Sequence, residues 1–444
     1  MPDCPIQIGL NSSVNDLFAA RTAAEGAARE RTGRKIITWK KEAGAAGNKL
    51  LESKAGLAVV NAADFQATGI DASRLPAMGA LFLPTLNISI VHAEPEQMNM
   101  LSVQDVAENP VLAIEPEYFV YAQSDEQAYI RGFRDGVDAL SDRLLGRPAP
   151  ALVVQQTAQP AGAATWGLMA CRVPGSRFTG VGIKVAVLDT GLDLSHPDFQ
   201  GRAITSQSFV DGEEVQDGYG HGTHCIGTSC GPTSPPLGPP RYGVAGSAEI
   251  FVGKVLNNLG GGTDGSILAG IDWSLAKGCH IISMSLGRRV PPGEPPQQAY
   301  EAAGSRALAV GCLIVAAAGN DSQRPDIILP VGSPANASTI LAAASIGEDL
   351  NISFFSNGGI NADGGEVNIA GPGENVFSTV PMPGRYGLKS GTSMATPHVA
   401  GVAVLLAGSD QSLRGQALWK RLTETAKPLP LPAKEVGAGL VQAP

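Results

Sequence analysis

The sequence predicts an α/β fold with a mostly parallel central sheet, preceded by a small α+β domain. From about residue 166 onward, continuous apolar segments alternate with helix-compatible ones, and the apolar segments lie at 181–189, 249–256, 280–287 and 313–319. Such runs are typical of strands buried on both faces, and the helices between them suit right-handed crossovers. The strand ends carry Asp189, Ser285 and Asn320, at the edge where parallel sheets bind ligands.

The region before this sheet is predicted to form a separate unit at residues 36–123. Short apolar strands at 36–40, 86–93 and 111–120 alternate with a helix-compatible segment at 96–109. No element is assigned to the Ala-rich leader, residues 1–35. Residues 124–160 combine a charged amphipathic stretch with a Pro-, Ala- and Gln-rich connector, which predicts a helix and a linker. The α/β domain then occupies residues 161–444.

Composition restricts the class of protein. With 444 residues, 43% apolar and 16% charged, the chain is typical of a globular enzyme of two or three folded units. A formal net charge of -9 without a Lys/Arg run argues against nucleic acid as a partner. The six cysteines lack metal-type spacing and are expected to be mostly reduced thiols.

Targeting signals are not evident in the sequence. No apolar stretch is long enough to span a membrane, so no membrane partner is expected. The first residues lack the basic and apolar regions of a signal peptide. We therefore expect a cytoplasmic protein, or a secreted one if the start is misassigned or export is unusual.

Three segments carry the residues of a nucleophilic serine site. A serine hydroxyl attacks when an imidazole takes its proton and a carboxylate orients that imidazole. The segment VAVLDTGLDLSHPDF places Asp189 at a strand end, GHGTHCIGTSCG places His221 between glycines, and GTSMATPHVAGVAVLL places Ser393 at a helix start. Pro397 is expected in the first helical turn, where proline is tolerated. Each residue alone suits an ordinary turn or cap, so the prediction depends on all three together.

These segments, in the order Asp, His, Ser, resemble the signatures of the subtilisin-like serine peptidases. The resemblance covers essentially all of 166–444 and includes the motifs AAAGN at 316–320, SMSLG at 283–287 and GAGLVQAP at 437–444. It implies a three-layer subtilisin-like α/β fold and a serine endopeptidase that needs no cofactor for its chemistry. By this resemblance Asp189 orients the base, His221 is the general base and Ser393 is the nucleophile. Asn320 and the Ser393 N–H would hold the oxyanion.

The resemblance also implies a channel for polypeptide substrates. It places the substrate backbone between two strand edges of the enzyme. The residues implied in substrate binding are Gly260, Gly261 and Gly262 on one edge, Ser285, Leu286 and Gly287 on the other, and in addition Ala318 and Gly319. Without the resemblance, three successive glycines indicate a flexible loop equally well. The cleft is expected to favour apolar or mixed residues at the cleaved position, with some tolerance for basic ones because Asp321 follows Asn320. Asp264 is expected to favour a basic side chain further upstream in the substrate.

Two features bear on metal binding. Asp198 matches a position that ligates calcium in many family members, so a structural calcium ion is a candidate; the Pro-rich segment 231–243 replaces the loop that usually supplies the other ligands. His221 and His224 form an H-x-x-H, but zinc sites need three or four ligands, and the zincin motif carries a glutamate between its histidines. Cys225 resembles a cysteine of the proteinase K-like branch, and taken alone it suits a small buried side chain.

Residues 36–123 resemble the inhibitory propeptide of this family, most clearly in the ending NPVLAIEPEYFVYAQ at 109–123. This implies a self-inhibited precursor whose tail enters the active-site cleft and whose maturation cut falls between about Tyr121 and Ala161. Two alternatives stay open. One is an intracellular processing peptidase or peptide transferase devoted to a single substrate, and the other is a catalytically silent binding module.

Overall fold

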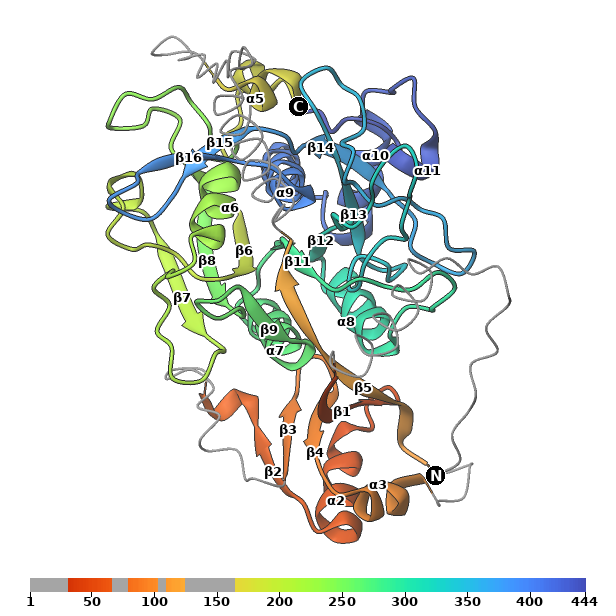
Figure 1. Cartoon of the computed structure of the whole chain (residues 1–444). Helices are drawn as coiled ribbons and strands as arrows, with labels where there is room; N and C mark the ends of the chain where they lie inside the picture. Colours follow the sequence, from red (N-terminus) through yellow and green to blue (C-terminus); the bar gives the residue numbers. More distant parts are fainter. Residues whose placement is uncertain (1–30, 66–78, 103–108, 124–163) are drawn as a thin grey trace, which may run out of the picture.

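The computed structural model describes residues 31–65, 79–102, 109–123 and 164–444. These residues form a small N-terminal domain and a larger domain that carries the central sheet (Figure 1). The helix and linker expected at 124–160, and most of the leader expected at 1–35, lie outside the described residues.

A parallel sheet forms the centre of the larger domain. In the described residues it has seven strands in the order β14-β13-β12-β10-β6-β8-β7, and each neighbouring pair is parallel. The strands are β6 (Lys184–Asp189), β7 (Ile204–Ser208), β8 (Glu249–Lys254), β10 (Ile281–Met284), β12 (Leu313–Ala317), β13 (Leu341–Ile346) and β14 (Ile369–Pro372). Because parallel neighbours need crossovers, helices lie between most of these strands in the chain.

Helices cover both faces of the sheet and make three layers. Val185 and Val187 of β6 pack with side chains of α6 (His221–Cys230) and α9 (Thr392–Ser409). Ala186 and Leu188, which point the opposite way, pack with side chains of α7 (Asp264–Ala276) and α8 (Gln298–Ala309). The uninterrupted apolar run of this strand thus fills two cores at once. The predicted three-layer α/β fold is confirmed.

Smaller elements complete the larger domain. They are α5 (Trp166–Ala170), the edge strands β9 (Gly261–Thr263) and β11 (Leu286–Gly287), the antiparallel pair β15 (Val376–Thr379) and β16 (Tyr386–Lys389), α10 (Gly415–Thr425) and α11 (Ala433–Val436).

The N-terminal domain is a mixed sheet with two helices. Its elements are β1 (Arg31–Trp39), α2 (Gly44–Ala55), β2 (Ala58–Asn61), β3 (Gly79–Leu83), β4 (Ile88–His92), α3 (Pro95–Ser102) and β5 (Val111–Ala122). Its own core includes Trp39, Leu51 and Val91, all nearly inaccessible to solvent. The first strand starts at Arg31, upstream of the expected domain start at residue 36.

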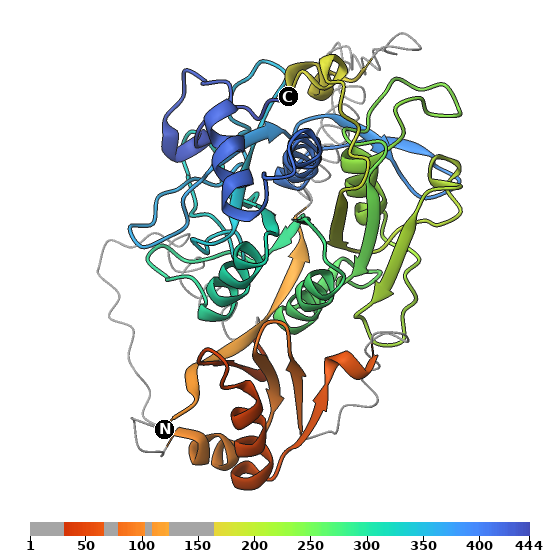
Figure 2. The same cartoon turned by 180° about the vertical axis from the view of Figure 1, so that it is seen from behind.

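β5 joins the two domains. Within the N-terminal domain it pairs antiparallel with β1, and its far end runs between β9 and β11 of the larger domain. Figure 1 and the reverse view in Figure 2 both show this strand entering the larger domain between α7 and α8. The end of the N-terminal domain therefore lies beside the carboxyl edge of the central sheet.

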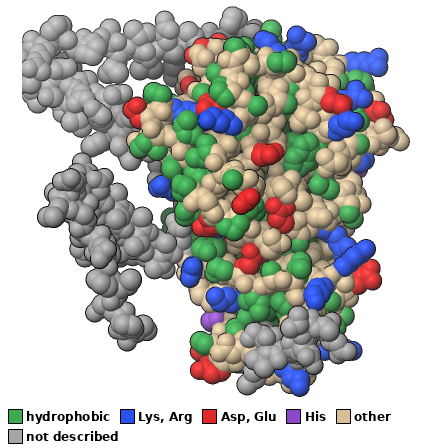
Figure 3. Space-filling view, turned by 90° about the vertical axis from the view of Figure 1, so that its right-hand side faces the viewer, with side chains coloured by type: hydrophobic (Ala, Val, Ile, Leu, Met, Phe, Trp, Pro, Cys, Tyr) green, Lys and Arg blue, Asp and Glu red, His purple; other side chains and the backbone are tan. Residues whose placement is uncertain are grey.

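The molecular surface seen in Figure 3 carries charged side chains of both signs, interspersed with hydrophobic ones. None of the helices within the described ranges combines the length and apolar character that a membrane crossing requires.

Candidate active site

Asp189 and His221 meet at the end of the central sheet. Asp189 is the last residue of β6, and His221 is the first residue of α6. His221 Nδ1 lies 2.8 Å from Asp189 Oδ1 and 3.0 Å from Oδ2, and both side chains are buried. Because the carboxylate holds the Nδ1–H, the ring's other nitrogen is left as a proton acceptor. That nitrogen, Nε2, is buried and has no hydrogen-bond partner among the described residues.

Asp217, which was not predicted from the sequence, links these two groups. Its carboxylate accepts the N–H groups of Gly220 and Thr223, at 2.7 and 2.8 Å, and so caps the start of α6. It also accepts the hydroxyl of Thr190, the residue after Asp189, at 2.9 Å. The N-cap residue of α6 is Gly220, which lies three residues after Asp217, so the usual N-cap signal would not have identified this aspartate.

Ser393 is the second residue of α9 and follows Gly391 and Thr392. Gly391 has a φ of 149°, and a Cβ built there would come within 2.8 Å of the Gln123 carbonyl oxygen and 3.1 Å of Asn320 Nδ2. A side chain at this position would therefore strain the backbone and collide with the groups beside the nucleophile.

The Gln123 carbonyl, at the end of the described N-terminal domain, lies between Ser393 and Asn320. Its oxygen accepts hydrogen bonds from Ser393 Oγ and from Asn320 Nδ2, both at 2.6 Å. Asn320 is itself fixed, because its Oδ1 accepts the N–H and the hydroxyl of Thr392 at 2.8 Å each. The Ser393 N–H was expected as the second donor, and in this structure the Ser393 hydroxyl donates to the oxygen.

Pro397 lies in the second turn of α9 rather than in the first turn as expected. Because proline has no N–H, the Ser393 carbonyl lacks the helical partner four residues on. That carbonyl instead accepts the Ser285 hydroxyl at 2.8 Å and lies 3.6 Å from Cys225 Sγ. The proline thus allows the backbone at Ser393 to be tied to the neighbouring chain edge.

Cys225 and His224 are core residues of α6. Cys225 is fully buried, with its Sγ 3.8 Å from His221 Nδ1. Burial, and then the charge of Asp189, raise the pKa of this thiol well above its usual value. His224 Nε2 bonds to the Val376 carbonyl at 3.0 Å, and burial lowers the pKa of its ring. The second histidine of the H-x-x-H is therefore a neutral packing residue.

β5 lies between the two predicted substrate-binding edges as an added strand. On one edge, Gly261 pairs with Tyr121 and Gly262 pairs with Val120. On the other edge, Leu286 pairs with Ala122 and Gly287 pairs with Tyr121.

Two further contacts extend this pairing toward Ser393. The Gly260 carbonyl accepts the Ala122 N–H at 2.9 Å, and the Ser285 carbonyl accepts the Gln123 N–H at 3.3 Å. Six of the predicted residues thus contact the main chain of one extended strand.

Ala318 and Gly319 contact other parts of the larger domain. The Ala318 carbonyl accepts the Gly332 N–H at 2.9 Å, and the Gly319 N–H donates to Thr392 Oγ1 at 3.2 Å. Among the described residues, neither forms a hydrogen bond with β5. They join β12 to Asn320 and so position the amide that contacts Gln123.

The effect of Asp264 and Asp321 on substrate side chains stays a prediction, and in this structure both carboxylates accept hydrogen bonds from the chain itself. Asp264 is fully buried, and its carboxylate accepts the Tyr118 N–H at 2.9 Å and the Tyr300 hydroxyl at 2.8 Å. Asp321 accepts the amide of Asn357 at 2.9 Å. The Asp264 carboxylate therefore binds main chain of β5, because the strand covers it completely.

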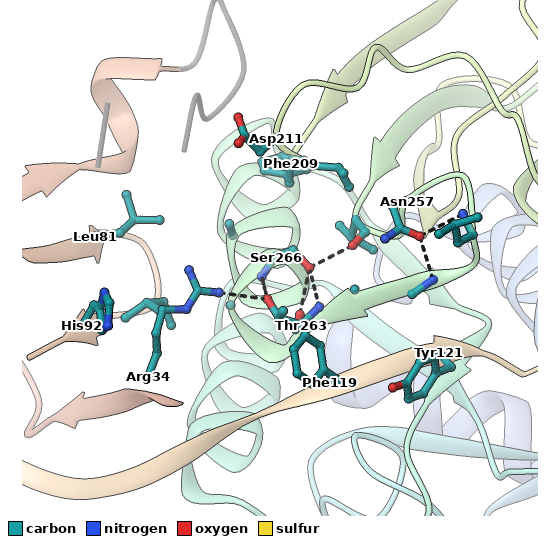
Figure 4. A pocket seen from close by; sticks show the side chains of 18 of the residues that line it. Arg34, Leu81, His92, Phe119, Tyr121, Phe209, Asp211, Asn257, Thr263 and Ser266 are labelled. Atoms are coloured by element: carbon teal, nitrogen blue, oxygen red, sulfur yellow. Dashed lines mark hydrogen bonds between the residues drawn. The ribbon is translucent and has the colours of Figure 1, made fainter. Parts of the chain in front are cut away.

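A cavity of about 780 Å³ separates the N-terminal sheet from α7 beside β9. Figure 4 shows Leu81 and His92 on the side of the N-terminal sheet, with Thr263 and Ser266 opposite. Arg34 reaches across and donates to Thr263 Oγ1 at 3.3 Å. The hydrogen bond between Arg34 and Thr263 therefore joins the two domains beside this cavity.

Asp198 does not fit a calcium ligand in this fold. Its carboxylate is nearly inaccessible, and it accepts the hydroxyls of Tyr242 and Tyr386, the latter at 2.9 and 3.0 Å from its two oxygens. Calcium requires six to eight oxygen ligands that offer lone pairs, whereas these phenols donate their protons to the carboxylate. Aromatic rings surround the group, since Tyr386 also stacks on Phe377 with 5.5 Å between ring centroids. The proposed calcium site at Asp198 is therefore set aside.

Replacing Asp198 with alanine is expected to destabilise the fold by about 2–3 kcal/mol, because the buried Tyr242 phenol and the partly buried Tyr386 phenol would lose a charged acceptor. Urea unfolding of a Ser393→Ala chain, which avoids self-digestion, would measure the change. Tyr386→Phe is the matched control and should cost less, since one hydroxyl bond to Asp198 survives. Two results would contradict this assignment together. One is a urea midpoint of the parent chain that falls when calcium is chelated, and the other is a urea midpoint that Asp198→Ala leaves unchanged.

Comparisons with known proteins agree with this geometry. A family profile described as "Subtilase family" matches residues 180–439. An intracellular serine protease of Paenibacillus polymyxa is 38% identical over 59% of this chain and 79% of its own length. Subtilisin Savinase of Lederbergia lenta is 38% identical over 63% of this chain and 96% of its own. Thermitase of Thermoactinomyces vulgaris is 39% identical over 52% of this chain and 77% of its own.

The profile begins after the N-terminal domain, at residue 180, and ends close to the C-terminus. It therefore includes β6, α6 and α9, the elements that carry Asp189, His221 and Ser393. Since this match spans more than half of the chain, the protein belongs to the subtilase family and is a serine endopeptidase.

Proposed function

We propose that Asp189, His221 and Ser393 hydrolyse peptide bonds through an acyl-enzyme, and that residues 36–123 hold the enzyme in a self-inhibited precursor. His221 Nε2 takes the proton of the Ser393 hydroxyl as the oxygen attacks the carbonyl carbon. The Asp189 carboxylate, 2.8 Å from Nδ1, orients the ring and stabilises the imidazolium that forms. His221 then passes the proton to the leaving amine, and water releases the acyl group by the reverse sequence.

The placement of Gln123 carries this proposal. Its carbonyl oxygen is 2.6 Å from both the Ser393 hydroxyl and the Asn320 amide. In this arrangement Asn320 donates to the oxygen on which negative charge develops. A backbone carbonyl held by exactly this pair of groups is what a peptide substrate would present, which supports polypeptides as the substrates.

The same contacts support the proposed self-inhibition. Because β5 occupies the edges of β9 and β11, no second peptide can pair with them while the strand remains bound. Cleavage near the end of β5 would leave the N-terminal domain bound as a product. Its later loss or degradation would then open the cleft.

Labelling by a fluorophosphonate probe tests the function directly. The purified chain should be labelled at Ser393 once the N-terminal domain has been cut and removed, and casein hydrolysis should appear at the same time. Labelling without hydrolysis of any peptide in a broad panel would favour the narrower alternative, a processing peptidase or transferase. Mass analysis of products separates these two, because a transferase joins the acyl group to an amine. A catalytically silent module would show neither label nor product.

The contacts between α7 and the N-terminal domain predict that acid tightens the self-inhibited complex. Burial raises the pKa of Asp264 and of Asp272, each to about 6. Each carboxyl accepts an N–H of the N-terminal domain, from Tyr118 and Leu86, at 2.9 Å. A carboxyl whose pKa is higher in the complex than after separation takes up a proton on association, so a fall in pH from 6 toward 4 favours the complex.

We expect the cut N-terminal domain to be retained about 10- to 100-fold more tightly at pH 5 than at pH 8, if both carboxyls return to ordinary pKa values on separation. Size-exclusion chromatography of the self-cleaved complex at the two pH values would measure retention. The double variant Asp264→Asn, Asp272→Asn should lose most of the difference. Tighter retention at pH 8 would contradict the prediction.

A cytoplasmic location is part of this proposal. The described cysteines are all unpaired, as is usual in a reducing compartment, and a similar protein is named an intracellular serine protease. Fractionation of the source cells would test it.

A further inference from the structure

We infer that Asn357 is a positioning residue for the reaction, because its side-chain amide holds the main chain next to Asn320 and so sets where the Asn320 amide points. The inference deepens the proposed function and rests on it, since it concerns the group that is proposed to hold the oxyanion. Among the described residues, Asn357 forms no hydrogen bond with Ser393 or Gln123, so it acts through its neighbours rather than on the substrate.

Asn357 lies in the segment between β13 and β14 and is fully buried. Its Oδ1 accepts the N–H of Asp321 at 3.0 Å, and the N–H and hydroxyl of Ser322 at 3.1 and 3.0 Å. Its Nδ2 donates to Asp321 Oδ2 at 2.9 Å, and its own N–H donates to the Gly319 carbonyl at 3.0 Å. Asn357 thus holds the residues before and after Asn320.

The donors and acceptors around Asn357 match an amide. Main-chain N–H groups can only donate, so they require an oxygen, whereas the Asp321 carboxylate can only accept, so it requires an N–H. An aspartate at position 357 would turn the 2.9 Å contact with Asp321 into a repulsion between two carboxylates. An alanine would leave the Asp321 N–H without this acceptor. The surroundings therefore fix both the residue type and the direction in which its amide faces.

Gly319 lets the Asn357 amide approach the main chain closely. Its φ is 110°, and a Cβ built there would lie 2.3 Å from Asn357 Nδ2. A side chain at this position would strain the backbone and displace the amide. The Gly319 N–H also donates to Thr392 Oγ1 at 3.2 Å. The glycine before Asn320 therefore admits the Asn357 side chain.

These contacts bear on catalysis because the Asn320 amide must meet an oxygen whose charge develops in the transition state. Asn320 Nδ2 lies 2.6 Å from the Gln123 carbonyl oxygen. Thr392 holds the Oδ1 end of the Asn320 side chain, and Asn357 holds the main chain that carries it. A misplacement of about 1 Å can cost roughly 10²-fold in rate. Loss of the Asn357 amide should therefore lower kcat and leave KM nearly unchanged.

Asn357→Ala is expected to lower kcat by about 10- to 100-fold, with KM within about threefold of the parent value. The measurement is hydrolysis of a fluorogenic peptide with leucine at the cleaved position. The enzyme is the full-length chain after it has processed itself, and fluorophosphonate labelling counts the active sites.

Asn368→Ala is the matched control for a lost side-chain bond to the main chain. Asn368 Oδ1 accepts the Ala342 N–H at 2.7 Å, just before β14 and at the opposite edge of the sheet from Ser393. The control variant should lose stability but keep its kcat. Equal losses of kcat in the two variants, or a loss below about threefold in Asn357→Ala, would overturn the inference.

A double-mutant cycle separates positioning from general damage to the fold. If Asn357 acts through the Asn320 amide, Asn357→Ala should change kcat by less than about threefold in a chain that already carries Asn320→Ala. Additive losses would overturn the inference and leave the proposed role of Asn320 intact. A loss of less than about threefold in Asn320→Ala alone would instead reject the proposed oxyanion donor, and the inference with it.

An exchange of the two side chains keeps the inference testable should Asn357→Ala not fold. Asn357→Asp alone should lower kcat by about tenfold or more, because its carboxylate faces that of Asp321. Adding Asp321→Asn restores one donor and one acceptor to this contact, so kcat should return to within about threefold of the parent value. The leucine peptide carries no charge at the cleaved position that would respond to the change at Asp321. Failure of the double variant to recover kcat would overturn the inference.

Discussion

Replacing Ser393 with alanine is expected to lower the turnover of peptide substrates by about 10⁶-fold, a magnitude known for subtilisin and carried over here rather than derived from geometry. The hydroxyl is the proposed nucleophile, and it lies 2.6 Å from the Gln123 carbonyl oxygen. The measurement is hydrolysis of a fluorogenic peptide together with fluorophosphonate labelling. The variant should accumulate as an uncut chain, since it cannot process itself.

The fold should survive this change. Ser393 is fully buried, but among the described residues its hydroxyl bonds to no more than the carbonyls of Gln123 and Ser285, and its backbone keeps the contact with the Ser285 hydroxyl. Ser409→Ala, at the other end of α9, is the matched control and should retain activity. Casein hydrolysis by Ser393→Ala at a rate close to that of the parent enzyme would refute the proposed nucleophile.

Replacing Asn320 with alanine is expected to lower turnover by about 10²- to 10³-fold with little change in substrate affinity, again a magnitude taken from subtilisin. The amide Nδ2, 2.6 Å from the Gln123 carbonyl oxygen, contributes most when that oxygen becomes negatively charged. Steady-state kinetics should therefore show the loss in kcat rather than in KM.

Asn320→Asp refines this test, because the carboxylate can still accept the N–H and hydroxyl of Thr392 but cannot donate to the oxyanion. Its turnover should be at least as low as that of Asn320→Ala. Asn351→Ala, at an exposed position, serves as the control. A loss of less than about threefold in Asn320→Ala would show that another donor holds the oxyanion.

Local patterns predicted most of the catalytic domain. The apolar run before Asp189 identifies a strand buried on both faces, and the glycines around His221 and Ser393 mark positions where the chain turns into a helix. These signals depend on neighbours in the chain, so they can be read without the fold. The glycines at 260–262 were different, because by themselves they suit a flexible loop equally well, and only the structure shows that they pair with β5.

The sequence by itself therefore determined the fold class, the family and the set of residues proposed to react. Only the tertiary structure decided which partners satisfy each buried carboxylate. Asp198 accepts hydrogen bonds from the hydroxyls of Tyr242 and Tyr386, and Asp264 accepts one from the main-chain N–H of Tyr118, which is far away in the sequence. The reason is physical: a buried charge must be paired or hydrogen-bonded, but which distant group pairs with it depends on how the elements pack. Likewise, the tail resembled a propeptide in the sequence, while only the structure placed the Gln123 carbonyl beside Ser393.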